Sequence, residues 1–102
     1  MKRPKYSVRL LRAAEDDFTE IVTYIAAERP EAAEALAQRI ESNLRLLATN
    51  PHLGRIPKDA ALLDLGYRYL VVQNYLIFYV IEERTILVHR IVHGARDFLG
   101  LF

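Results

Sequence analysis

The spacing of apolar residues changes twice along the chain and predicts a strand, two helices and three further strands. Apolar and polar residues alternate over residues 5–11, which predicts a short strand with one buried face. From Ala13 the apolar residues recur every three or four positions, first to about Ala27 and then from Pro30 until just before Asn50-Pro51. These two segments predict helices that fold back on each other as a hairpin, because so few residues join them.

The C-terminal part of the chain returns to a period of two. Three segments separated by two-residue turns predict strands: residues 67–72, 75–82 and 85–93. The expected fold is therefore α+β, in the order β-α-α-β-β-β, with the helical hairpin packed on an antiparallel sheet. Residues 51–66 contain two prolines and two glycines and predict a loop with room for one short turn, and loops of this length are often functional.

The predicted sheet is apolar on both faces. In the central strand Tyr75, Ile77 and Tyr79 alternate with the equally apolar Leu76 and Phe78. The helical hairpin can cover one face, so the other face is either a core under the apolar C-terminal tail or a docking surface for a partner. We therefore expect the isolated chain to be prone to aggregation and its complex to be soluble.

Length and composition narrow the class of protein. The chain has 102 residues, of which 52% are hydrophobic and 26% are charged, as expected for one globular domain that spans residues 1–102. It has no cysteine, which excludes disulfides, thiolate zinc sites and thiol nucleophiles. We find no apolar run long enough to span a membrane and no secretory signal pattern, so we expect a cytoplasmic protein.

Charge is segregated along the chain although the net charge is only +1. Residues 1–12 carry five basic residues and no acidic one, whereas residues 13–34 carry seven acidic residues and one arginine. Acidic residues at the start of a helix complement its dipole, so the acidic block has an ordinary structural explanation. A nonspecific nucleic-acid-binding protein is usually far more basic overall.

The sequence offers few residues for catalysis or metal binding. His89 and His93 share a face of the last predicted strand but lie about 13 Å apart at strand spacing, and His52 is in the loop. We therefore predict no metal and no cofactor. Neither serine has the surroundings of a nucleophile, and there is no glycine-rich phosphate loop.

Basic residues on or near the last strands are the remaining candidates. They are Arg68, Arg90, His93 and Arg96. One interpretation is structural: the arginines pair with Asp64, Glu82 or Asp97 or bind core carbonyls, and His93 is a satisfied structural residue. The other is functional: the guanidinium groups recognise an anionic partner, and His93 exchanges protons near neutral pH.

The ordered set of segments YIA, NPHLGR, GYRYLVVQNYLIFYVIEE and RIVHGARD resembles the RelE/ParE toxin superfamily of bacterial type II toxin–antitoxin systems. The resemblance covers nearly the whole chain. It implies a small growth-inhibiting toxin that forms a hetero-oligomer with a cognate antitoxin, which wraps around it and neutralises it.

The two branches of the superfamily act differently. The RelE-like branch cuts messenger RNA on the ribosome with basic residues of the sheet and tail, without a metal, and the corresponding candidates are Arg68, His93 and Arg96. Two further basic positions of that branch fall on Leu70 and Leu76, and the terminal aromatic residue is Phe102, which has no hydroxyl.

The ParE-like branch inhibits DNA gyrase by binding and needs no catalytic residues. Its pattern is matched better, by the run Arg90 to His93 followed by Asp97. We therefore favour a gyrase-directed toxin, with an RNA-cleaving toxin as the alternative. The residues expected to contact the target or the antitoxin are Arg68, Arg90, His93, Arg96 and Asp97.

Overall fold

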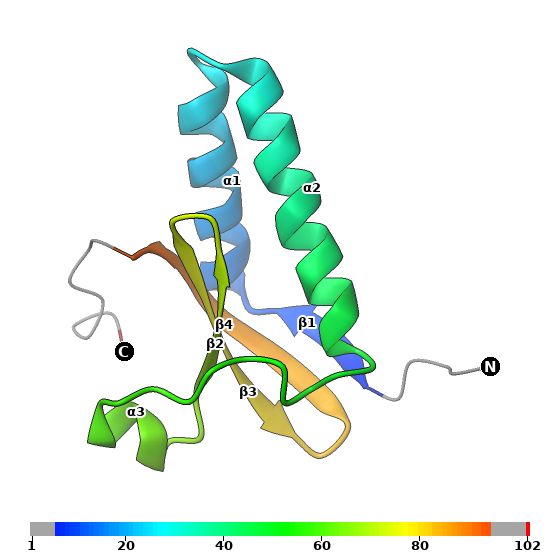
Figure 1. Cartoon of the computed structure of the whole chain (residues 1–102), viewed down its shortest axis with the longest axis vertical. Helices are drawn as coiled ribbons and strands as arrows, with labels where there is room; N and C mark the ends of the chain where they lie inside the picture. Colours follow the sequence, from blue (N-terminus) through cyan, green and yellow to red (C-terminus); the bar gives the residue numbers. More distant parts are fainter. Residues whose placement is uncertain (1–5, 95–101) are drawn as a thin grey trace.

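The computed structural model describes residues 6–94 and Phe102. The elements along the chain are β1 (Ser7–Leu10), α1 (Arg12–Ala26), α2 (Pro30–Leu47), α3 (Ala60–Asp64), β2 (Arg68–Val72), β3 (Tyr75–Glu82) and β4 (Thr85–His93). The predicted order and the helical hairpin are confirmed (Figure 1). The only added element among the described residues is α3, a single turn in the predicted loop, where the Asp59 side chain accepts a hydrogen bond from the Leu62 amide.

The sheet has the strand order β1-β4-β3-β2 and is mixed, not wholly antiparallel as expected. β2 with β3 and β3 with β4 are antiparallel, but β1 runs parallel to β4 with Ser7 opposite Thr85. The chain path explains the parallel pair. The helical hairpin returns the chain to the end of the sheet where β1 begins, so β2 runs in the same direction as β1. The next tight turn reverses the chain in β3, and the turn after it reverses the chain again, so β4 is parallel to β1.

The helical hairpin covers one face of the sheet and forms the main core with it. Ile77, Tyr79 and Val88 of the sheet pack there with Leu36 and Ile40 of α2, and all five are at most 2% exposed. The far turns of both helices project past the sheet (Figure 1). None of the helices in the described part of the chain is long and apolar enough to cross a membrane.

The opposite face, which the sequence predicted to be apolar, carries a second apolar cluster. Leu62 of α3 packs with Tyr67, Phe78, Val80 and Val92. The ring of the last residue, Phe102, lies against Tyr67 and Phe78, with ring centroids 4.8 and 5.1 Å apart. The other apolar residues expected to cover this face, Phe98, Leu99 and Leu101, lie outside the described residues.

A β-bulge in β4 changes which side chains face the helices. Phe78 pairs with Arg90 while the next residue, Tyr79, pairs with Val88, so His89 is the extra residue. Val88, just before the bulge, faces the helices, and so does Ile91, after the bulge. The expectation that His89 and His93 share a face was therefore wrong: His89 lies against Tyr67 in the second cluster, and His93 lies against Tyr75 on the helix side.

The segment before α3 is fixed to the sheet by a buried tyrosine. The Tyr79 hydroxyl accepts a hydrogen bond from the Gly54 amide at 2.9 Å and donates one to the Pro51 carbonyl at 2.8 Å. A Cβ atom on Gly54 would lie 2.6 Å from that hydroxyl, so only glycine allows this approach. Arg55 then forms a β-bridge with Tyr69. The NPHLGR segment is thus an anchored part of the fold.

Candidate partner-binding site

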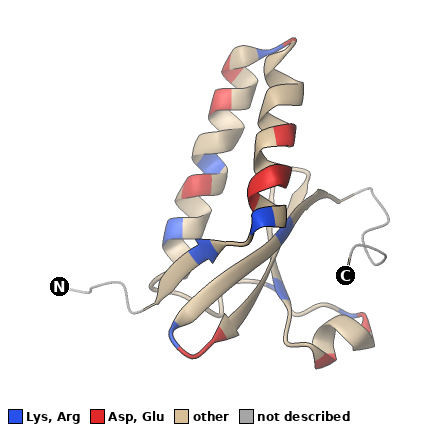
Figure 2. Cartoon of the chain, turned by 180° about the vertical axis from the view of Figure 1, so that it is seen from behind, with Lys and Arg blue, Asp and Glu red and all other residues tan. Residues whose placement is uncertain are grey.

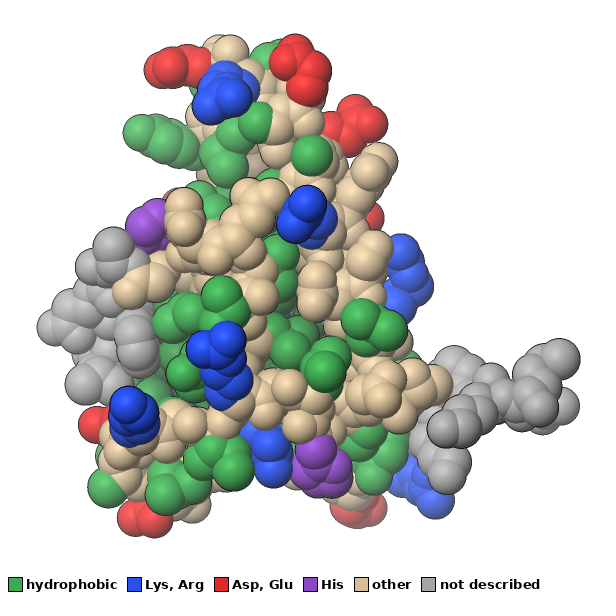
Figure 3. Space-filling model, in the orientation of Figure 1, with side chains coloured by type: hydrophobic (Ala, Val, Ile, Leu, Met, Phe, Trp, Pro, Cys, Tyr) green, Lys and Arg blue, Asp and Glu red, His purple; other side chains and the backbone are tan. Residues whose placement is uncertain are grey.

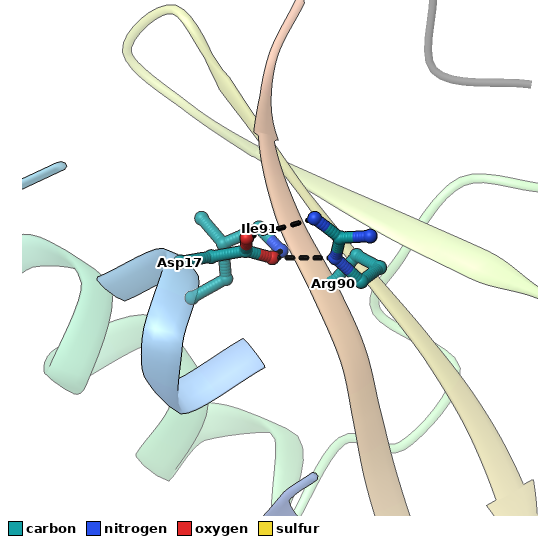
Figure 4. A network of polar contacts seen from close by, with 3 residues as sticks. All are labelled: Asp17, Arg90 and Ile91. Carbon is teal, nitrogen blue, oxygen red and sulfur yellow. Dashed lines mark hydrogen bonds and ion pairs between the residues drawn. The ribbon is translucent and has the colours of Figure 1, made fainter. Parts of the chain in front are cut away.

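Arg90 is held in a bidentate ion pair with Asp17 of α1 (Figure 4). Its Nε and Nη2 atoms donate to the carboxylate at 2.7 and 2.9 Å, and the backbone amide of Ile91 donates to the same carboxylate at 2.9 Å. These hydrogen bonds raise the pKa of Arg90, which burial partly opposes. β1 ends at Leu10, so it does not extend along β4 as far as Ile91. The Asp17 carboxylate, and not a neighbouring strand, accepts the hydrogen bond from the Ile91 amide. Arg90 is therefore paired within the chain, with a partner that the structural interpretation did not name.

The sequence did contain a signal for this ion pair. Asp17 lies on the apolar stripe of α1, three residues after the buried Ala14 and next to the half-buried Phe18. An acidic residue on the inward face of a helix requires a buried partner. The sequence could not show which arginine supplies it, because the two residues are 73 positions apart.

Arg68 is also engaged within the chain. Its Nη1 atom donates to the Gly54 carbonyl at 3.1 Å and lies 3.5 Å from the His52 carbonyl. Arg68 is on the edge strand β2, and Arg90 is on β4 with β3 between the two strands. The structure therefore does not gather these two arginines into one cationic site.

His93 is exposed at the end of β4, with its ring 5.3 Å from that of Tyr75 in an edge-to-face arrangement. It borders an open groove between α1 and β4. The other two predicted site residues, Arg96 and Asp97, lie outside the described residues. Of the five predicted residues, His93 is thus the one that the described structure leaves on an accessible surface next to α1.

Sequence reasoning missed a pair of titratable residues on the opposite face. The Tyr67 hydroxyl lies 2.7 Å from Nδ1 of His89. Burial raises the pKa of Tyr67, and burial also lowers the pKa of His89, which the charge of Glu82 partly opposes. The two rings also meet edge to face, with centroids 5.0 Å apart. The bulge brings the two rings together, and the strand pattern gives no sign of it.

The described residues contain no group of three or more His, Asp or Glu side chains that could hold a metal ion. The exposed apolar residues Leu53, Ile56, Leu63 and Leu65 lie on the loop and around α3, where hydrophobic side chains gather in the lower part of Figure 3. The described surface therefore offers grooves and apolar patches suited to a macromolecular partner.

An α-hairpin packed on a four-stranded mixed sheet is a fold of the RelE/ParE type. The family model described as the ParE toxin of type II toxin–antitoxin system, parDE, matches residues 8–98. The chain therefore belongs to the ParE toxin family of type II toxin–antitoxin systems. The search of curated proteins gave no significant match.

Two solved structures share the fold. A chain of the chromosomal ParDE toxin–antitoxin system of P. aeruginosa is 21% identical, with a TM-score of 0.72 over 89% of this chain and 98% of that one. A chain of the RelBE2 toxin–antitoxin complex of Mycobacterium tuberculosis is 20% identical, with a TM-score of 0.60 over 87% of this chain and 98% of that one. At this level of identity the likeness establishes the fold.

Proposed function

We propose that this toxin acts in the cytoplasm by binding DNA gyrase and that a cognate antitoxin neutralises it. Membership of the ParE family and the fold shared with chains of two toxin–antitoxin systems support an antitoxin partner. The antitoxin would cover surfaces that the isolated toxin leaves exposed.

The state of the arginines favours binding over RNA cleavage. A metal-free ribonuclease needs a base for the 2′-hydroxyl and free cations for the charge that develops on the phosphate. Arg90 is already paired with Asp17, and Arg68 already binds a loop carbonyl. Leu70, at a position where the RNA-cleaving branch has a basic residue, is 6% exposed and packs in the core beneath the helices. A cation at that position would face the helices and not a substrate.

The test is supercoiling of relaxed plasmid by purified gyrase and ATP, with and without the toxin. A parallel reaction asks whether the toxin cuts messenger RNA on stalled ribosomes. We expect loss of supercoiling, no cut RNA, and full recovery of supercoiling when the antitoxin is added. Cut RNA with normal supercoiling would overturn the proposal in favour of the ribonuclease. Inactivity in both assays would overturn both readings and leave a scaffold that binds only its antitoxin.

A matched pair of variants tests the proposed contact site. His93→Ala should weaken gyrase inhibition by about tenfold or more, as expected for a residue inside an interface. His52→Ala changes an exposed histidine of the loop before α3 and should leave inhibition unchanged. Equal potency of the two variants would show that gyrase is recognised elsewhere.

A further inference from the structure

The side of α1 that faces the end of β4 carries two adjoining grooves. The first, of about 670 Å³, lies between α1 and β4, and the second, of about 610 Å³, lies between the tip of the hairpin and the β2–β3 turn. Both are lined by Thr23 and Tyr24, so the two grooves form one continuous surface along α1.

Apolar residues form part of the lining of the first groove. Ile91 and Val92 of β4 and Ile21 of α1 line it. β1 ends at Leu10, so no strand among the described residues covers this half of β4 on the side of α1. Ile91 and Val92 are only 1% and 2% exposed, so the apolar surface that a partner can reach in this groove is that of Ile21 and Tyr24 on α1.

Tyr24 is the ridge between the two grooves and is 83% exposed. No hydrogen bond or ring contact involves it among the described residues, so its side chain contributes little to the fold. A tyrosine of this kind is typical of an interface anchor, because it offers a large rigid surface at a low entropic cost.

The charged residues on the walls of this surface leave an excess of one carboxylate, that of Glu20. Asp17 is neutralised by Arg90, but Glu20 is exposed on the same wall and its charge also raises the pKa of Arg90. Glu28 borders the second groove beside Arg29. Figure 2 shows acidic residues along α1, and they belong to the acidic block of residues 13–34. A basic side chain of a partner would complement Glu20.

We propose that this surface, Tyr24 with the grooves on either side of it, binds a segment of the antitoxin that combines aliphatic side chains with lysine or arginine. The aliphatic side chains pack against Ile21 and the ring of Tyr24, and a basic side chain pairs with Glu20. The inference rests on the proposed function, since it names where the antitoxin of that proposal docks and which chemistry it uses.

The test measures the affinity of the toxin for the purified protein encoded by the adjoining gene, at low and at high salt. Tyr24→Ala should weaken binding by about 30-fold, the effect of losing an interface anchor. Glu20→Lys should weaken it by about tenfold at low salt and by less at high salt, because salt screens the repulsion. Glu20→Gln should lose less affinity than Glu20→Lys. Because it adds no positive charge next to Arg90, it controls for repulsion between Arg90 and the new lysine.

The controls change the same kinds of residue on α2, outside both grooves. Leu46→Ala removes another exposed apolar side chain, which is 49% exposed, and Glu34→Lys reverses another exposed charge. Both should bind within about twofold of the wild type, since residues away from an interface contribute little. Circular dichroism and thermal melting check that all variants fold.

The outcomes separate the two proposals. If the wild-type complex forms and the Tyr24 and Glu20 variants bind as well as their controls, the docking surface is refuted while the antitoxin partnership stands. If the wild-type toxin forms no complex, the partnership fails, and the docking surface fails with it. If Glu20→Lys instead abolishes self-association of the free toxin, the occupant is a second copy of this chain and the inference is wrong.

Discussion

Replacing Asp17 by alanine is the most informative test of how the sheet and the helices are held together. The change removes a carboxylate that accepts three hydrogen bonds, two from the guanidinium of Arg90 and one from the amide of Ile91. It leaves a partly buried cation without its partner and an amide without an acceptor. The fold has no other carboxylate on Arg90 among its described ion pairs.

The size of the effect follows from these contacts. Breaking a buried ion pair by removing one partner costs about 3–5 kcal/mol. The Arg90 side chain is 21% exposed, so water can replace part of what is lost, and we expect a loss of about 2–4 kcal/mol in the free energy of unfolding. Domains of this size are stable by only about 5–15 kcal/mol, and each kcal/mol shifts the melting temperature by about 4–8 °C. The variant should therefore melt at least about 8 °C below the wild type.

The assay is urea unfolding followed by circular dichroism, with thermal melting beside it. Asp16→Ala is the matched control, because Asp16 is the neighbouring acid and is 65% exposed in a 3.7 Å ion pair with Arg12. That surface pair should contribute about 0.5 kcal/mol or less. Arg90→Leu and the double variant complete a cycle in which the two losses should not add. A loss of less than about 1 kcal/mol for Asp17→Ala, or equal losses for Asp16→Ala and Asp17→Ala, would refute the reasoning.

Two further substitutions probe the loop anchor and the second apolar cluster. Tyr79→Phe should lower the free energy of unfolding by about 1–3 kcal/mol, because it strands the buried Gly54 amide; an unchanged urea midpoint would show that the loop is held by other contacts. For His89, burial lowers the pKa, so below about pH 6.5 the unfolded chain binds a proton before the folded protein does, and the free energy of unfolding should fall as the pH drops. His89→Gln should flatten this dependence and keep a hydrogen bond to Tyr67 within reach; a slope as steep as that of the wild type would contradict the assignment.

The arrangement of elements could be predicted because it depends on local patterns. The change from a period of three and four to a period of two separates helices from strands, and Pro30 and Pro51 mark where helices can begin and end. The sequence also showed that β3 is apolar on both faces, and each face carries an apolar cluster. These features need only neighbouring residues, which the sequence displays directly.

The candidate site was harder to predict because it depends on pairs of distant residues. Arg90 was expected to pair with a nearby acid or to face a partner, and instead it binds Asp17 at the other end of the chain. Arg68 binds carbonyl groups, which have no sequence signature. The parallel pairing of β1 with β4 was missed for the same reason, since it depends on where the hairpin returns the chain.

The bulge at His89 reverses the alternation of side chains between the two faces of β4. Up to Val88 the even-numbered positions face the helices, and from Ile91 the odd-numbered ones do. Before the bulge, odd-numbered residues face away from the helices. After it, odd-numbered residues face the helices, so a polar side chain placed there would enter the main core. Loss of a single residue here would exchange inside and outside for the whole end of the strand, including the residues that line the groove beside α1. The orientation of the side chains at the end of β4 thus depends on the extra residue of the bulge. This part of the strand can accept substitutions, but not the loss of a residue.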